Sequence, residues 1–153
     1  MSTDAKELIF EETAREKLKQ GIDHVGNIVG VTLGPKGRNV ALGAKWGSVQ
    51  ITNDGSSIIK DLSFKDQYVN MGAFLAKEAA HKMKESCGDG TTTTLLLLQA
   101  LVKEGIKNVA SGSSPIILKK GMEKALSFIL QELKSSSIPV TTEAEIKNVA
   151  TIA

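Results

Sequence analysis

Apolar residues recur at intervals of three and four over most of the chain, which is the spacing of one face of a helix. Between residues 11 and 31 that face is Ala14, Leu18, Ile22, Val25 and Val29. The pattern predicts further helices over 66–87, 91–110, 115–134 and 143–153, with a short helical piece ending near Lys60. It therefore predicts a mainly α fold, in which several long helices pack as a bundle.

Three short apolar segments are too brief for helices and are predicted as strands. One is Leu8 to Phe10, and the others are Asn39 to Leu42 and Val49 to Thr52. A glycine-containing loop with Trp46 joins the last two, which is typical of a β-hairpin. We expect one small hairpin beside the helices.

Two helices carry specific expectations about packing. The face predicted to point inward on the helix 66–87 consists of Met71, Phe74 or Leu75, Ala79 and Met83. The helix 91–110 begins with four threonines and four leucines and is apolar on most sides. A helix that is apolar on most sides is usually buried, so we expect this one to be central.

Composition narrows the class of protein. The 153 residues suit one domain, whose core must be aliphatic because 41% of residues are hydrophobic and only 4% aromatic. The net charge of +2 is spread along the chain, which argues against nucleic acid or a membrane as partners. The longest uncharged apolar run, Leu95 to Val102, is too short to span a bilayer, and we expect a cytoplasmic protein. Cys87 is the single cysteine and has no accompanying catalytic pattern.

The turn Gly88-Asp89-Gly90 opens directly into Thr91 to Thr94. Backbone N–H groups at a helix N-terminus lack intrahelical partners and attract anions, so this turn could hold a phosphate. Four threonines cost a helix about 2 kcal/mol relative to alanine, and a single cap would not need them. Asp89 would repel a phosphate unless magnesium lay between them. Simple capping and core packing remain the alternative.

Two other turns carry complementary residues. Thr32 to Gly37 holds glycines that let backbone approach a ligand closely, although a glycine-rich helix end is often only a turn. In the turn Thr52 to Gly55, the carboxylate of Asp54 could position a water or an ion near a transferred phosphoryl group, or simply form an Asp-Gly turn. The glycine-rich sequence of a Walker A loop does not occur.

Four motifs in order resemble the signatures of the GroEL-type, bacterial (type I) chaperonins. They are Thr32-Leu33-Gly34-Pro35-Lys36-Gly37-Arg38-Asn39-Val40, Ile51-Thr52-Asn53-Asp54-Gly55, Asn70-Met71-Gly72-Ala73 and Gly88-Asp89-Gly90-Thr91-Thr92-Thr93. The resemblance covers residues 6–153 and implies the N-terminal part of a chaperonin subunit. Residues 1–135 would be the first segment of the equatorial, ATP-binding domain, and 136–153 the start of the intermediate domain. The apical domain and the second equatorial segment would be absent.

The resemblance also implies a site for ATP and magnesium. Thr32, Leu33, Gly34 and Pro35 would contact the nucleotide, and a potassium ion would lie near the backbone oxygen of Thr32. Asp89 would bind magnesium, Gly90, Thr91, Thr92 and Thr93 would hold the phosphates, and Asp54 would be catalytic by positioning water. Asn53 stands where bacterial members usually carry a lysine of the nucleotide site; asparagine there resembles the archaeal and eukaryotic branch, which also hydrolyses ATP.

The implied function is ATP-driven folding of unfolded client proteins in ring assemblies, with a co-chaperonin. The family's catalytic aspartate of the returning intermediate segment would be missing, so we expect negligible ATP hydrolysis by this chain. The alternative is a non-enzymatic chaperonin paralogue or fragment that acts in assembly or protein interaction. Self-association is expected through the hairpin 39–52 and through exposed apolar helix faces around Leu95 to Leu98.

Overall fold

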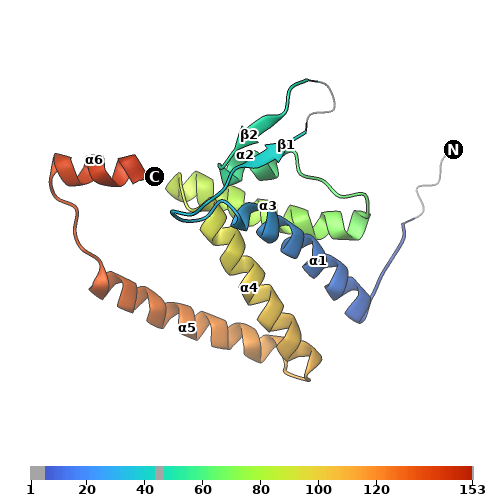
Figure 1. Ribbon diagram of the computed structural model, residues 1–153. Coiled ribbons are helices and arrows are strands. Elements are labelled where there is room, and N and C mark those ends of the chain that lie inside the picture. Colours follow the sequence, from blue (N-terminus) through green and yellow to red (C-terminus); the bar gives the residue numbers. More distant parts are fainter. Residues whose placement is uncertain (1–5, 44–46, 153) are drawn as a thin grey trace. The chain divides into compact units, whose positions relative to one another are not determined.

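Six helices and one antiparallel pair of strands make up the described part of the computed structural model, residues 6–43 and 47–152 (Figure 1). In chain order they are α1 (Glu11–Gly30), β1 (Val40–Leu42), β2 (Gln50–Thr52), α2 (Gly55–Lys60), α3 (Gln67–Cys87), α4 (Thr91–Ala110), α5 (Pro115–Ser136) and α6 (Glu143–Ile152). The prediction of a mainly α fold with one small hairpin is confirmed. The predicted loop residue Trp46 lies outside the described residues.

The strand predicted at Leu8 to Phe10 is wrong. These residues have no regular secondary structure, and the side chains of Leu8 and Phe10 are exposed. Three consecutive apolar residues lack the alternation of apolar and polar positions that distinguishes a strand. In the described structure, β1 pairs only with β2.

The chain forms two compact units, Met1–Ile106 and Lys107–Ala153, and the break between them falls inside α4. The equatorial and intermediate segments predicted from the sequence, with a boundary between residues 135 and 136, stay predictions.

The core lies in the first unit, where α1, α2, α3 and the start of α4 meet. It consists of Ile22, Val25, Val29, Ile58, Ile59, Ala73, Ala76, Ala80 and Leu95. The face predicted for α1 is therefore confirmed at its three C-terminal positions, while Ala14 and Leu18 are half-buried.

Helices α1 and α3 pack with their backbones unusually close. A β-carbon on Gly21 would lie 2.0 Å from the carbonyl oxygen of Val69, and one on Gly72 would lie 2.1 Å from that of Leu18. Two glycines on facing helices thus leave room for neither side chain. The helices are held together by backbone contact and small residues rather than by interlocking large ones.

This close packing overturns the inward face predicted for α3. Met71, Phe74 and Leu75 are exposed, whereas Ala79 and Met83 are half-buried. The buried residues of α3 are Val69, Gly72, Ala73, Ala76 and Ala80. Hydrophobicity alone favours the face with the large apolar side chains, but only the face with small residues lets α3 approach α1.

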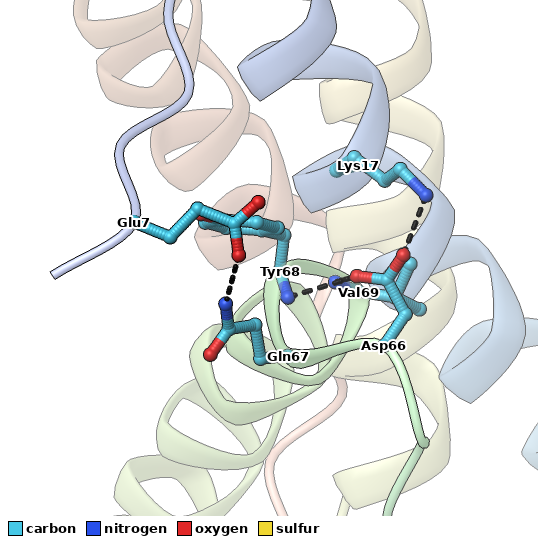
Figure 2. A network of polar contacts seen from close by, with 6 residues as sticks. All are labelled: Glu7, Lys17, Asp66, Gln67, Tyr68 and Val69. Atoms are coloured by element: carbon cyan, nitrogen blue, oxygen red, sulfur yellow. Dashed lines mark hydrogen bonds and ion pairs between the residues drawn. The ribbon is translucent and has the colours of Figure 1, made fainter. Parts of the chain in front are cut away.

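A polar network fixes the start of α3 against α1 (Figure 2). Asp66 is the N-cap, and its Oδ1 accepts hydrogen bonds from the backbone N–H of Tyr68 at 2.9 Å and Val69 at 3.1 Å. Its other oxygen accepts from Lys17 Nζ at 2.5 Å, and this contact with Lys17 is the main reason that the pKa of Asp66 is lowered. Beside it, Gln67 Nε2 donates to Glu7 Oε2 at 2.9 Å and ties the segment before α1 to α3.

The hairpin pairs Val40 with Thr52, Ala41 with Ile51 and Leu42 with Gln50. Val40 and Leu42 pack against the core from one face, while Ile51 points away and is 68% exposed. Because β2 leads through Asn53 and Asp54 into α2, the hairpin holds the second glycine turn at the edge of the core.

Helix α4 is less buried than expected. Thr91 and Leu95 are buried, Leu96 and Leu98 are half-buried, and Leu97 and Leu101 are exposed. The expectation of a central helix therefore holds only for one side of its first turns. In the described part of the chain, no helix combines the length and apolarity that a membrane crossing requires.

The second unit contains α5 and α6, whose ranges agree with those predicted. Pro115 is the first residue of α5, where a missing N–H costs nothing. At α6, Glu145 Oε2 accepts from the backbone N–H of Thr141 at 3.0 Å and Thr142 at 2.9 Å, and these bonds lower its pKa to about 2. Glu145 N in turn donates to the Thr142 hydroxyl at 3.3 Å, which completes a capping box.

Candidate functional site

Two glycines in the left-handed conformation precede the start of α4. Gly88 ends α3 with φ 78° and donates its N–H to Lys84 O at 2.9 Å, and Gly90 has φ 86°. Gly90 O then accepts the first helical bond of α4, from Thr94 N at 2.9 Å. The N–H groups of Thr91, Thr92 and Thr93 come before that bond, so the helix geometry gives them no acceptor within α4. This is the arrangement that favours an anion.

Asp54 caps α2 with both carboxylate oxygens. Oδ1 accepts from Ser56 N at 3.2 Å, and Oδ2 accepts from Ser57 N at 2.9 Å and from the Ser57 hydroxyl at 2.7 Å. The hydrogen bond from the Ser57 hydroxyl is the main cause of the lowered pKa of Asp54. The two backbone hydrogen bonds and the charge of Lys84 lower this pKa further, whereas burial raises it. The carboxylate is therefore ionised at neutral pH, and it remains exposed.

The starts of α2 and α4 touch each other. A β-carbon on Gly55 would lie 2.5 Å from Thr92 Oγ1, and the hydroxyls of Ser56 and Thr91 are 3.2 Å apart. Thr91 is buried, at 8% exposed, whereas Thr93 on the next face is exposed. The structure thus brings together the second and third glycine turns, which lie 35 residues apart in sequence.

The first glycine turn comes to the same end of the core. Gly26 lies against Gln99 and Gly30 against Leu96, so α1 runs antiparallel to α4. Gln99 Nε2 also donates to Asn27 Oδ1 at 3.0 Å, which fixes this register. The segment after α1 therefore emerges at the end where α4 begins, as Figure 1 shows.

Backbone hydrogen bonds hold that first turn in shape. Thr32 N and Oγ1 both donate to Val29 O, at 3.0 and 2.8 Å, and Arg38 N donates to Val31 O at 2.8 Å. Gly34 has φ 79°, and a β-carbon on Gly37 would lie 2.2 Å from Thr32 O. Both glycines are thus required by the turn itself, and Leu33, Gly34 and Pro35 remain exposed along it.

The residues predicted to hold ions are placed at this end too. Asp89 lies between the two left-handed glycines and is exposed, as is Asn53 next to Asp54. Within the described residues no group of three or more His, Cys, Asp or Glu side chains could hold a metal. Magnesium in nucleotide sites needs only one or two carboxylates, with phosphates and water completing its octahedron, so the exposed carboxylate of Asp89 fits such an ion when a phosphate lies at the N–H groups of α4. The roles predicted for these residues, and the potassium ion at Thr32, stay predictions.

The sequence did not identify Ser56, Ser57 and Lys84 as residues of the site. With Thr91 they line a cavity of about 590 Å³, which also includes Ile59, Lys60, Lys77, Ala80 and His81. The two serines follow Asp54-Gly55, and serine after a capping aspartate is a signal of a helix start that could have drawn attention to them. Cys87 is exposed at the end of α3, one residue before the turn.

Comparisons with known proteins show which family the chain resembles. Residues 25–153 match the TCP-1/cpn60 chaperonin family. The chain is 53% identical to "Chaperonin GroEL 3" of Protochlamydia amoebophila (strain UWE25) over 147 residues, which are 96% of this chain and 28% of that protein.

A solved structure is also similar. The chain superposes with a TM-score of 0.71 and 29% sequence identity on the "Crystal structure of group III chaperonin in the open state", covering 84% of this chain and 25% of that one. The chain thus spans about a quarter of the length of these relatives. The resemblance to GroEL-type chaperonins and the predicted chaperonin fold are both confirmed, and the chain belongs to the TCP-1/cpn60 chaperonin family.

Proposed function

We propose that this chain carries the phosphate- and magnesium-binding part of an ATP site in a protein-folding chaperonin. The observation that carries the proposal is the contact between the starts of α2 and α4. Through Gly55 against Thr92 and the Ser56 and Thr91 hydroxyls, it brings the start of α2, which directly follows the ionised Asp54, against the start of α4 with its N–H and hydroxyl donors. Donors for phosphate next to a carboxylate that can hold water are what ATP binding and hydrolysis require.

Each residue then has a defined task. The N–H and hydroxyl groups of Thr91, Thr92 and Thr93, with Gly90, hold the β- and γ-phosphates, and the segment Thr32 to Pro35 contacts the rest of the nucleotide. Asp89 holds magnesium, which neutralises phosphate charge when bound. Asp54 accepts a hydrogen bond from the attacking water, since its lowered pKa keeps it ionised. A potassium ion at Thr32 O completes the proposed set.

The whole protein would use this site to fold client proteins. We propose that it forms rings, takes up unfolded proteins and works with a co-chaperonin, driven by ATP. The 153-residue chain holds only some of the proposed site, so we expect weak nucleotide binding and negligible hydrolysis by it.

Replacing Asp89 with alanine should weaken the binding of Mg-ADP at least tenfold, or roughly 1.4 kcal/mol, because the metal loses its carboxylate. Titration calorimetry of the 153-residue chain measures this. Glu78→Ala is the matched control: it removes one exposed carboxylate from the adjacent helix α3 and should change the affinity less than about twofold.

An unchanged affinity for Mg-ADP in Asp89→Ala would refute the proposed magnesium role. A wild-type chain that binds no nucleotide would refute the site. Steady ATP hydrolysis by the wild-type chain that Asp89→Ala abolishes would instead show that the expectation of negligible turnover is wrong.

A second function, assembly through the hairpin 39–52, is favoured by the exposure of Val49 and Ile51 on and beside β2. Large apolar side chains on a two-stranded sheet gain from a neighbouring chain that covers them. Ile51→Glu should therefore lower the mass measured by light scattering at micromolar concentration. Ile138→Glu makes the same change at a position that is 88% exposed and should leave the mass unchanged. A wild-type monomer, or equal masses for Ile51→Glu and wild type, would exclude this role.

A further inference from the structure

Two Asp-Gly pairs occur in the chain, Asp54-Gly55 and Asp89-Gly90, and no Asn-Gly pair does. An Asp-Gly pair can react internally, because glycine has no side chain that shields its backbone nitrogen from the neighbouring carboxyl group. The reaction needs a carboxyl group that is free to turn toward this nitrogen and a backbone that can close a five-membered ring. The structure gives the two pairs opposite environments.

The pair Asp54-Gly55 is held in an unreactive arrangement. The carboxylate oxygens of Asp54 accept hydrogen bonds from Ser56 N at 3.2 Å, Ser57 N at 2.9 Å and the Ser57 hydroxyl at 2.7 Å. The carboxylate therefore reaches past the nitrogen of Gly55 to cap α2. Gly55 is buried, and a β-carbon on it would lie 2.5 Å from Thr92 Oγ1, so this backbone has little space to move.

The pair Asp89-Gly90 has none of these restraints. Asp89 is exposed, and within the described part of the chain its carboxylate forms no hydrogen bond or ion pair. The N–H of Gly90 also donates no backbone hydrogen bond there, because the bonds of α4 begin at Thr94 N. Gly88 and Gly90 flank the aspartate with φ 78° and 86°, and a β-carbon on Gly88 would meet no atom within 4 Å. The two groups that must meet are thus both free.

The reaction at this pair consumes and releases only water. The Gly90 nitrogen attacks the side-chain carbonyl carbon of Asp89, a carbon–nitrogen bond forms, and one water leaves with a carboxyl oxygen and the amide hydrogen. Water then adds to either carbonyl of the resulting succinimide and breaks its bond to nitrogen. Opening at the main-chain carbonyl leaves Gly90 joined to the side-chain carboxyl group, which is isoaspartate, and opening at the other carbonyl restores aspartate.

We propose that Asp89-Gly90 is a site of spontaneous covalent modification, where the folded chain converts aspartate to isoaspartate, and that the fold protects Asp54-Gly55 from the same reaction. The product carries its carboxylate on the α-carbon and has one more methylene in the main chain between α3 and α4. A consequence rests on the proposed function, which assigns magnesium to Asp89: the modification displaces the metal ligand and slowly inactivates the nucleotide site.

Peptide mapping of the 153-residue chain after prolonged incubation in warm neutral buffer tests the proposal. Trypsin places the two pairs in separate peptides, 46–60 and 85–103. Electron-transfer fragmentation distinguishes isoaspartate from aspartate in each peptide, and methylation by an isoaspartyl methyltransferase measures the total. Asp89→Glu is the matched control, because glutamate would have to close a six-membered ring, which forms more slowly.

We expect isoaspartate to accumulate in the peptide 85–103, while aspartate persists in 46–60. Asp89→Glu should remove most of the methylation signal of the folded chain. In urea that unfolds the chain, Asp54 loses its hydrogen bonds and Gly55 its packing, so both pairs should react at similar rates. The difference between the two pairs is therefore expected only in the folded chain.

Two results would overturn the proposal. One is isoaspartate that forms at Asp54 as fast as at Asp89 in the folded chain, or that does not form at Asp89 at all. The other is a preference for Asp89 that persists unchanged in urea, since neighbouring sequence and not the fold would then protect Asp54.

The consequence for the nucleotide site is tested separately, by calorimetry of fresh and aged chain with Mg-ADP. A loss of affinity in proportion to the isoaspartate content supports it. Unchanged affinity in the modified chain contradicts the magnesium role of Asp89 and leaves the modification standing. A fresh chain that binds no nucleotide refutes the proposed function and likewise leaves the modification standing.

Discussion

Replacing Gly72 with alanine is expected to lower the free energy of unfolding by about 3 kcal/mol, although alanine is the better helix former by about 1 kcal/mol. The added β-carbon would lie 2.1 Å from the carbonyl oxygen of Leu18 and 2.9 Å from its Cα. These are backbone atoms, so no side-chain rotation relieves the overlap, and α1 and α3 must move apart. Urea denaturation followed by circular dichroism measures the loss.

Gly121→Ala is the matched control for this change. Gly121 lies within α5, and a β-carbon there would meet no atom within 4 Å. The same substitution should therefore be neutral or stabilise α5 by up to about 1 kcal/mol. If Gly72→Ala unfolds at the same urea concentration as wild type, the close packing of α1 and α3 is refuted.

The second large loss is expected from Leu95→Ala, at about 3 kcal/mol, because removing a fully buried leucine leaves a cavity. Leu95 is 1% exposed and belongs to the core formed by α1, α2 and α3. It lies one turn after Thr91, whose hydroxyl meets that of Ser56. The substitution should therefore weaken nucleotide binding as well as stability, because α4 loses the core contact that holds its first turn in place.

Leu97→Ala provides the comparison within the same helix. Leu97 is 59% exposed, so removing it should cost less than about 1 kcal/mol and leave nucleotide affinity unchanged. Urea denaturation and calorimetry with Mg-ADP, performed on both variants, test this difference. Equal destabilisation by the two substitutions would contradict the burial of only one side of α4.

Periodicity predicted the ranges of the helices well because most end at strong local signals. Asp66 caps α3, Gly88 ends it, and Pro115 begins α5, and each acts through its own backbone or side chain. Which face turns inward depends instead on a partner helix that is distant in sequence. For α3 the deciding feature was Gly72 opposite Gly21, and hydrophobicity favoured Met71, Phe74 and Leu75 on the wrong side.

The candidate site, too, could be predicted from the sequence only in part. Its glycine turns were visible in the sequence, since Gly34, Gly88 and Gly90 adopt the left-handed conformations that glycine allows. The contact of Gly55 with Thr92 could not be read from either motif, because it depends on how α2 packs on α4. Lys84 was missed for a similar reason: a lysine on a helix surface has no distinguishing neighbours until the fold places a cavity beside it.

Helix α1 touches two partners through glycines on different sides, Gly21 toward α3 and Gly26 and Gly30 toward α4. At Gly21 the main chains of α1 and α3 meet, and at Gly26 and Gly30 the side chains of Gln99 and Leu96 lie against the main chain of α1. The position of α1 along its axis should therefore be insensitive to which large residues cover the rest of the helix. A slip of one helical turn would carry Thr32 about 5.4 Å along the axis. The distance between the turn after α1 and the threonines of α4 is therefore set by the helix packing. Substitutions on the outer face of α1 should change the surface of that helix without changing this distance.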